Sequence, residues 1–403
     1  MNVWILNHYA EPPEGQATRS FDLGRELIRH GHEITIFASS YSHYKHQELK
    51  LAPGEWTRSE TIEGVRFIWL RTFPYRRNDL RRALGMLGYA VNALRAGRRN
   101  PIKPDLIIGV SVHPLAALSA YVLSRSKGAR FMFEVTDLWP LTLVEFGLLS
   151  PNNPLTWLMR RLEEFLYRRA ERIILLLRDA DSYVVDHGGT RDRVVWIPNG
   201  VDLSRYTSLW NYTGGQPGKL TVMYLGGLVQ ANAIDVILDT ARILQEENVE
   251  GVRFVLVGGG QDRDRLISRA DTLELKNVEF RGVVPKRQLA GIMQEADAFV
   301  STLRSLPLYR YGISLNKICD YLSSGRPVLF SGEASYDAVR EAGAGFSVAP
   351  EDPRALADAV KRMRDTAPAD RAAMGRRGIE YVRKHHDIGV LAARLERAWQ
   401  VST

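Results

Sequence analysis

The sequence contains a single cysteine, Cys319, among 403 residues. One thiol cannot form an internal disulfide, and it excludes a metal site built from several thiolates. Long apolar runs are also missing, since no stretch approaches the roughly 20 residues that cross a bilayer. Residues 1–15 show neither the basic segment nor the cleavage site of a signal peptide. These absences predict a cytoplasmic protein.

The sequence also lacks the dinucleotide-binding motif G-x-G-x-x-G after its first strand. The nearest match, VGGGQDRDRL (257–266), carries Arg263 where the third glycine is required, and it lies far along the chain. We therefore reject a dinucleotide-dependent dehydrogenase.

Acidic residues are nearly absent from residues 71–103, which hold nine basic side chains and one acid, Asp79. The resulting +8 equals the net charge of the whole chain. No interleaved aromatic residues or reader module support nucleic-acid binding. Within the stretch, one helical face carries Leu80, Leu84, Leu87, Val91 and Leu94. We expect this face to pack on the first sheet, and the arginines to remain in solvent or to attach the protein to an anionic membrane surface.

Short β-rich runs alternate with helical patterns along the whole chain, which indicates doubly wound α/β domains with buried parallel strands. The predicted strands are 2–7, 33–38, 65–70, 105–110, 130–135, 172–177, 220–225, 252–258, 277–282, 296–302 and 326–331. The series pauses at IPNGVDLSRY (197–206) and a glycine-rich segment. We predict one domain over 1–200 with a returning helix over 385–403, and a second domain over 201–384. Ligands should lie beyond the carboxyl ends of the strands, in a cleft between the domains.

Three polar segments follow strands of the first domain. Gly15 and Arg19 lie in the loop after the first strand, where helix-start amides could bind an anion or simply form a turn. Glu134 and Asp137 follow a later strand and could orient a sugar or accept a proton, although Asp137 could instead cap the next helix. His113 is a further polar candidate, with a structural role as its alternative.

The segment GISLNKICDYLSSGRPVL (312–329) predicts a helix that begins with polar residues. With Ser314 as its cap, the amides of Leu315, Asn316 and Lys317 would face a diphosphate, and Lys317 would add a full charge. Asp320 lies four residues after Asn316, on the same helical face, and could hold a ribose. The alternative is a Lys317–Asp320 pair on a solvated helix.

The ordered set GHEITIF (31–37), DLWP (137–140), IPNGVD (197–202), LVGGG (256–260), VEFRGVVPKRQL (278–289), AD (296–297) and DYLSSGRPVL (320–329) resembles the retaining glycosyltransferases of family 4. The resemblance covers nearly the whole chain and implies the GT-B fold, with two tandem Rossmann-like domains. The first, 1–200 with 385–403, would bind the acceptor, and the second, 201–384, would bind the nucleotide sugar. It is most similar to the bacterial enzymes that add amino sugars in O-antigen, capsule or exopolysaccharide synthesis.

The resemblance also implies roles for particular residues. The family's second glutamate, which grips the donor ribose, falls on Asp320, and the first falls on Gly312. A family histidine that meets the donor sugar is replaced by Thr136, beside Asp137. The segment 224–238 keeps Gly226 and Gly227 as a donor loop but lacks the family's diphosphate-binding Arg and Lys.

The first substitutes for the missing cations are Lys317 and the nearby amides, and the second are Arg304 and Arg310. No Asp-x-Asp signature occurs beyond the surface-like DRD (262–264), so we expect no metal and no other cofactor.

The implied activity is transfer of a sugar, an N-acetylated hexosamine or 6-deoxyhexosamine, from a UDP-sugar to a polyprenyl-diphosphate-linked acceptor. The enzyme would work at the inner face of the plasma membrane, attached through residues 71–103. Two alternatives remain: a UDP-sugar 2-epimerase of the same architecture, and a degenerate, non-catalytic scaffold subunit.

Overall fold

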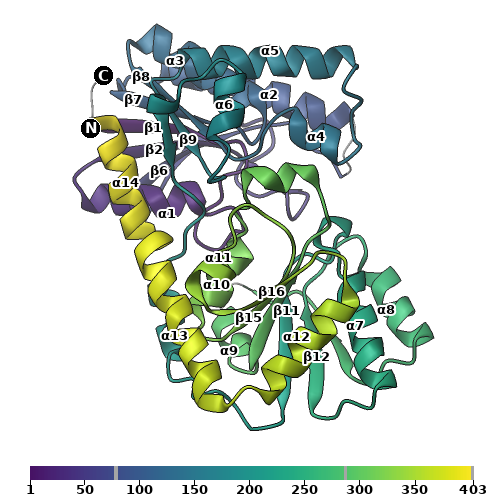
Figure 1. The fold of residues 1–403 in the computed structure, drawn as a ribbon. Coiled ribbons are helices and arrows are strands. Elements are labelled where there is room, and N and C mark those ends of the chain that lie inside the picture. The colour runs from purple at the N-terminus through teal and green to yellow at the C-terminus, as the bar shows by residue number, and fades with distance from the viewer. Residues whose placement is uncertain (77–79, 286–287, 401–403) are drawn as a thin grey trace. The chain divides into compact units, whose positions relative to one another are not determined.

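The structure is a computed structural model that describes residues 1–76, 80–285 and 288–400. The chain divides into two compact units (Figure 1). Unit 1 comprises Met1–Pro198 with Ile388–Thr403, and unit 2 comprises Asn199–Asp387. Each unit is a parallel β-sheet covered by helices.

Unit 1 contains an eight-stranded sheet in the order β10-β9-β8-β7-β1-β2-β6-β5, parallel except for the edge strand β5. Its strands are β1 (Asn2–Leu6), β2 (Glu33–Ser39), β5 (Thr57–Ile62), β6 (Val65–Leu70), β7 (Leu106–Val110), β8 (Arg130–Val135), β9 (Arg172–Leu175) and β10 (Val194–Trp196). The short β3 (Tyr41–Ser42) and β4 (Gln47–Glu48) pair separately. The interior strands are buried on both faces, which explains their continuous apolar sequences.

The helices of unit 1 are α1 (Arg19–Arg29), α2 (Leu80–Arg99), α3 (Pro114–Lys127), α4 (Leu141–Glu145), α5 (Pro154–Arg169), α6 (Asp181–Asp186) and α14 (Ile388–Gln400). The C-terminal α14 packs against α1, and its Leu391, Leu395 and Trp399 join the core formed by β1 and β2. Helix α3 contacts both α2 and α5.

The face of α2 that packs inward is not the one that the sequence predicted. Its buried residues are Gly85, Tyr89, Ala90, Ala93, Ala96 and Gly97, whereas Leu80, Leu84, Leu87 and Val91 are exposed. Small residues let α2 approach its neighbour closely: a Cβ on Gly97 would lie 2.6 Å from Leu123 of α3. The prediction that the leucine face packs on the sheet is therefore wrong.

Unit 2 contains a six-stranded parallel sheet in the order β13-β12-β11-β14-β15-β16. Its strands are β11 (Leu220–Leu225), β12 (Val252–Val257), β13 (Val278–Arg281), β14 (Ala298–Thr302), β15 (Val328–Ser331) and β16 (Gly345–Val348). Its α-helices are α7 (Asp235–Glu246), α8 (Arg263–Thr272), α9 (Leu289–Met293), α10 (Asn316–Ser323), α11 (Ala338–Ala342), α12 (Pro353–Asp365) and α13 (Pro368–His385). Numbered along the chain, the strands follow the order 3-2-1-4-5-6 of Rossmann sheets.

All eleven predicted strands are confirmed, with ends that move by at most two residues. The sequence did not predict β3, β4, β5, β10 or β16. The sequence of β5, TRSETI, is polar apart from Ile62, since β5 lies at the sheet edge and none of its residues is buried; β3, β4, β10 and β16 are short. Within the described residues, no helix combines the length and the apolar character needed to cross a membrane.

Candidate functional site

In unit 2, strands β11 and β14 are neighbours at the point where the strand order reverses. The chain continues from them in opposite directions, so the loops beyond their carboxyl ends diverge and leave room for a ligand. Gly226 and Gly227 follow β11, and Arg304 follows β14. The topology therefore brings three of the predicted donor-binding residues to one edge of the sheet.

Lys317, in the first turn of α10, lies at the same edge. Its Nζ donates to the hydroxyl of Tyr224, at 3.2 Å, and to Oδ1 of Asn232, at 2.8 Å. Asn232 and Tyr224 in turn donate to the carbonyl of Gly227, at 2.7 and 2.8 Å. The ammonium also lies 5.0 Å from the centroid of the Tyr224 ring. Lys317 is thus held beside the glycine loop by neutral groups, and no described carboxylate forms an ion pair with it.

Burial lowers the pKa of Lys317 from 10.5 to about 7. A desolvated ammonium gains from an anion placed next to it, because the anion replaces the lost hydration. Near neutral pH the Lys317 amine is therefore only partly protonated. A bound diphosphate would favour the protonated, positively charged form.

The amino-terminal end of α10 is built differently from the sequence prediction. The N-cap is Leu315, with φ −90° and ψ 119°, and no side chain caps the helix. Ser314 instead accepts a hydrogen bond from the Asn199 backbone N–H at 2.9 Å, and its carbonyl accepts from the Asn199 side chain at 2.7 Å. Ser314 as the helix cap was wrong, but the helix start keeps amides that no side chain occupies, where an anion is favoured.

Asp320 lies one helical turn after Asn316 in α10. The side chain of Asn316 is exposed. The hydroxyl of Tyr206 donates to Asp320 Oδ1 at 2.7 Å and fixes the carboxylate. The alternative of a Lys317–Asp320 pair is not what the structure shows, since Lys317 bonds to Tyr224 and Asn232. Gly312, where the resembled family has a glutamate, adopts φ 95° and ψ 174°, a conformation that favours glycine.

The loop between β14 and α10 contributes Arg304, which is half-buried and makes no hydrogen bond or ion pair with the part of the chain that is described. Arg310, the other proposed substitute cation, donates to the Tyr311 hydroxyl at 2.9 Å. Of the two, Arg304 keeps its guanidinium available for an anionic ligand.

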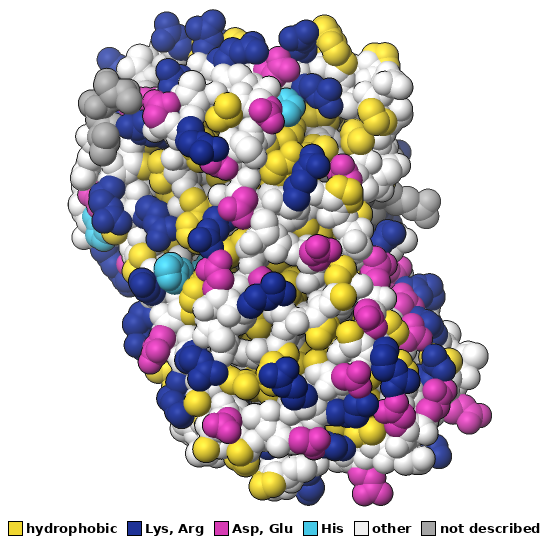
Figure 2. Space-filling model, viewed as in Figure 1, with side chains coloured by type: hydrophobic (Ala, Val, Ile, Leu, Met, Phe, Trp, Pro, Cys, Tyr) yellow, Lys and Arg dark blue, Asp and Glu magenta, His cyan; other side chains and the backbone are white. Residues whose placement is uncertain are grey.

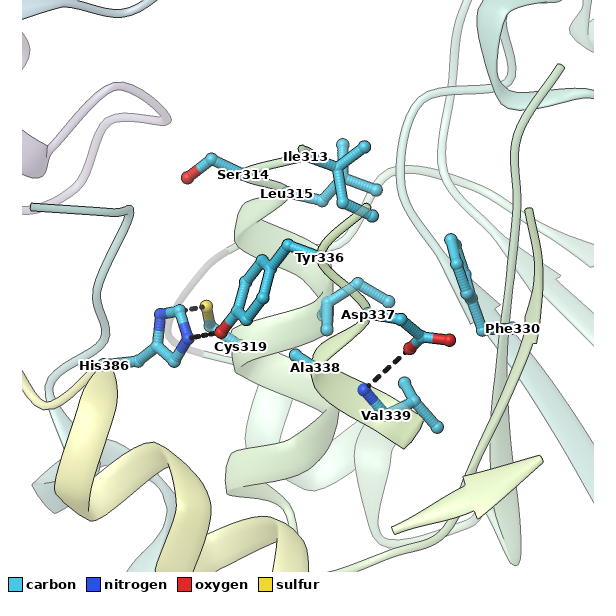
Figure 3. Close-up of a pocket in the computed structure, with 11 residues that line it drawn as sticks. Ile313, Ser314, Leu315, Cys319, Phe330, Tyr336, Asp337, Ala338, Val339 and His386 are labelled. Carbon is cyan, nitrogen blue, oxygen red and sulfur yellow. Dashed lines mark hydrogen bonds between the residues drawn. The ribbon is translucent and has the colours of Figure 1, made fainter. Parts of the chain in front are cut away.

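A small apolar pocket lies between α10 and α11 (Figure 3). Ile313, Ile318, Phe330 and Val339 contribute to its walls, and the Asp337 carboxylate is used to cap α11. These apolar walls offer no match for phosphates, so we do not assign it to a nucleotide.

In unit 1, the corresponding reversal lies between β1 and β7 and brings His8 and His113 together. His113 caps α3: its Nδ1 accepts from the Ala116 N–H at 3.2 Å. The ring hydrogen of neutral His113 therefore sits on Nε2 and donates to His8 Nδ1, at 2.7 Å. Burial, followed by the charge of Arg82, lowers the pKa of His113 to about 3. These contacts give His113 a structural role and offer no support for a catalytic one.

Glu134 and Arg19 form a nearly buried ion pair at 3.1 Å. The Arg19 guanidinium also donates to the carbonyls of Ile197 and Pro198. The loop around Gly15 is closed by Glu11, whose Oε2 accepts from the Gln16 N–H at 2.7 Å. A protein carboxylate therefore occupies an amide of the loop at Gly15, and Arg19 is committed to Glu134.

Asp137 follows β8 and is exposed. Its Oδ2 accepts a weak hydrogen bond from the Thr136 hydroxyl at 3.4 Å, and it does not cap α4, whose N-cap is Pro140. Although the carboxylate keeps a solvent-exposed edge, the surrounding protein displaces enough water to raise the pKa of Asp137, against the effect of Thr136. Among the three predicted catalytic residues, Asp137 alone remains open to a substrate.

Sequence reasoning missed the partners that fix these groups. Tyr224 is the penultimate residue of β11, and Asn232 lies in the segment 224–238; neither side chain carries a charge that would mark a diphosphate site. Tyr206 and Glu11 carried no signal in the sequence, because their roles depend on contacts between distant segments.

Comparison with known proteins identifies both units. Residues 14–200 match the glycosyl transferase 4-like domain, and residues 219–365 match the glycosyl transferases group 1 domain. The colanic acid biosynthesis glycosyl transferase WcaI of Escherichia coli is 23% identical over 269 residues, which are 63% of this chain and 64% of that protein. The glycosyltransferase WbjE of Pseudomonas aeruginosa is 22% identical over 262 residues, with the same coverage. The chain thus spans just under two thirds of the length of these relatives.

Two solved structures show the same fold over the whole chain. Sucrose-phosphate synthase from Thermosynechococcus elongatus has a TM-score of 0.77 and 16% identity, covering 99% of this chain and 98% of its own. HepE from Anabaena, in complex with UDP, has a TM-score of 0.69 and 16% identity, covering 99% and 100%. With both domains matched by glycosyltransferase families, the chain belongs to the glycosyltransferases and has their GT-B fold.

Proposed function

We propose that this glycosyltransferase is a retaining, metal-independent enzyme of bacterial cell-surface polysaccharide synthesis. It transfers an N-acetylated hexosamine or 6-deoxyhexosamine from a UDP-sugar to a polyprenyl-diphosphate-linked acceptor. The relative named for colanic acid biosynthesis and the neighbour solved with UDP support this direction. Unit 2 holds the donor, and unit 1 presents the acceptor hydroxyl.

The observation that carries the proposal is the position of Lys317. Its ammonium sits at the amino-terminal end of α10, next to Gly227, and its hydrogen-bond partners there are neutral. The leaving diphosphate gains negative charge as the glycosidic bond breaks, and a fixed cation at that point lowers the barrier. Arg304 can add a second positive charge from the loop after β14.

Asp320 is assigned to the ribose. Its carboxylate is oriented by Tyr206 and can accept hydrogen bonds from two vicinal hydroxyls. On the acceptor side, Asp137 is the group we assign to the sugar or the attacking hydroxyl, while Gly15, Arg19, Glu134 and His113 shape the surrounding loops.

The test is a panel of nucleotide sugars measured by calorimetry, followed by turnover with a short-chain lipid-diphosphate acceptor in the presence and absence of a chelator. We expect UDP-sugars to bind, Asp320→Asn to weaken them, and activity to survive chelation. Incubation with the donor alone separates transfer from epimerisation, since an epimerase would convert the sugar without an acceptor. Binding without any turnover would favour a scaffold and contradict the proposal.

A further inference from the structure

The exposed face of α2 is unusual for a soluble helix. Leu80, Leu84, Leu87 and Val91 follow one another along it, and they are between 41% and 76% exposed. The same stripe continues to Arg95 and Arg98. Exposed large side chains that occur singly are common, but a contiguous row marks an interaction surface.

A second row lies at the start of α5 and in the segment that precedes it. Leu148, Leu155, Trp157 and Leu158 are 51% to 67% exposed. Helix α4, which leads into this segment, consists largely of half-buried apolar residues. Further along α5, Arg160, Arg161, Arg168 and Arg169 are exposed. The helix thus follows the order of α2, with apolar residues first and arginines after them, although Arg161 and Arg168 pair with Glu164 at 3.2 and 3.4 Å.

The two rows flank one helix. Helix α3 packs against both α2 and α5, and its outward side chains Leu115, Leu118 and Val122 are half-buried. In Figure 1, α5 begins at the end of unit 1 where α4 lies, and Figure 2 shows hydrophobic side chains together with Lys and Arg side chains over that end. We call the eight exposed residues of the two rows the apolar rim.

From this arrangement we infer that the apolar rim inserts into the headgroup region of an anionic lipid leaflet, while the arginines of α2 and α5 bind its phosphates. The inference deepens the proposed function, on which it rests for the lipid nature of the acceptor. It adds an insertion surface on α5 and the segment before it, outside residues 71–103.

Charge decides between a lipid leaflet and a protein partner. Every charged residue of α2 is an arginine, and none is acidic. An amphipathic helix with Leu on one part and arginines beside it is suited to lie in the plane of a membrane interface. Each basic residue near an anionic leaflet strengthens binding by about fivefold. Arg95 and Arg99 also stack on Trp56, with guanidinium-to-ring distances of 4.3 and 5.7 Å, so Arg98 and Arg160 are the better choices for charge removal.

The test is flotation of the full chain with vesicles of phosphatidylcholine alone and of phosphatidylcholine with phosphatidylglycerol. We expect binding to the anionic vesicles, with Leu84→Ser/Leu87→Ser and Trp157→Ser/Leu158→Ser each lowering it about tenfold or more, even at high salt. Arg98→Gln/Arg160→Gln should lower it mainly at low salt. The matched control is Val283→Ser, which removes a side chain in unit 2 that is 71% exposed and should change nothing.

Folding of each variant is checked by its affinity for UDP and by its unfolding midpoint. The inference is overturned if the wild-type chain ignores anionic vesicles, or if both serine pairs bind them as well as wild type does. It is also overturned if the rim variants instead abolish a dimer seen by light scattering, because the face would then join two copies. Vesicle binding in an enzyme that transfers no sugar would leave this inference intact and reject the proposed function.

Discussion

Replacing Lys317 by methionine should change stability and ligand binding in opposite directions. Methionine keeps the apolar stem and removes the ammonium. A pKa of about 7 in place of 10.5 means that burial of the charged form costs up to about 5 kcal/mol. Because the side chain is only partly buried, this value is an upper limit. The variant should therefore unfold at a higher denaturant concentration than wild type at pH 6.5.

The pH dependence fixes the sign of this effect. An unfolded chain holds the lysine proton up to pH 10.5, whereas the folded chain releases it near pH 7. Between these values the unfolded state binds more protons, so wild-type stability rises with pH and the cost is complete only below pH 7. The advantage of Lys317→Met should shrink by about 1.4 kcal/mol for each pH unit between 7 and 10. Urea denaturation at pH 6.5 and pH 9 measures it.

Binding should respond in the opposite way. A diphosphate beside Lys317 favours the protonated amine, so complex formation takes up a proton above pH 7 and affinity falls by up to about tenfold per pH unit. Loss of one charged hydrogen bond, worth about 1.5–3 kcal/mol, should weaken binding by about 10- to 100-fold and remove this pH dependence. A UDP-sugar is a better ligand for calorimetry than UDP, because UDP has a terminal phosphate that titrates at about pH 6 and would add its own pH dependence.

The control is Lys276→Met, which removes an exposed lysine of unit 2. It should leave both the stability at pH 6.5 and the affinity unchanged. The reasoning fails if Lys317→Met destabilises the protein at pH 6.5, or if the variant binds the UDP-sugar as tightly as wild type with the same pH profile.

Three further substitutions test other parts of the structure. Burial raises the pKa of Glu163 to about 8, so wild-type stability should fall as the pH rises from 4.5 to 8; Glu163→Gln should remove up to about 5 kcal/mol of that loss, measured by denaturation at pH 5 and pH 8.5. Tyr206→Phe removes the hydroxyl that donates to Asp320 and should weaken UDP-sugar binding by about tenfold with little change in unfolding, a result that equal affinities would contradict. Gly312→Glu restores the family's acid at a backbone conformation that favours glycine and should lower the thermal midpoint rather than raise activity, with higher turnover as the outcome against it.

The fold could be predicted from the sequence because its strands carry their own signal. A strand such as β7, buried on both faces, is continuously apolar. Short apolar runs of this kind, separated by segments long enough for a helix, indicate a doubly wound domain. The strands that escaped prediction lack this signal. Strand β5 lies at the sheet edge with no buried residue, so its sequence is polar apart from Ile62 and resembles a loop when read alone.

The candidate site could be predicted only in part. Lys317 and Asp320 share a helix, so their spacing alone places them together. Tyr224 and Asn232 reach Lys317 from other segments, and that contact exists only because β11 and β14 are neighbours. Ser314 resembles a helix cap by position, yet Asn199, more than a hundred residues away, takes its hydroxyl as an acceptor. A prediction based on neighbouring residues alone cannot include a distant donor such as Asn199, which takes the place of the helix amides.

Helix α2 shows why periodicity alone does not determine which side of a helix is buried. Its sequence has two stripes at helical spacing, one of leucines and one of small residues that includes Gly85, Ala93 and Ala96. Hydrophobicity favours burying the leucines, but packing density favours the stripe that lets two helices approach closely, as Gly97 does against Leu123. The core gains contact along the small stripe, and the leucines stay outside. This exposed row, with the arginines beside it, is the basis of our proposal that α2 contacts an anionic lipid leaflet.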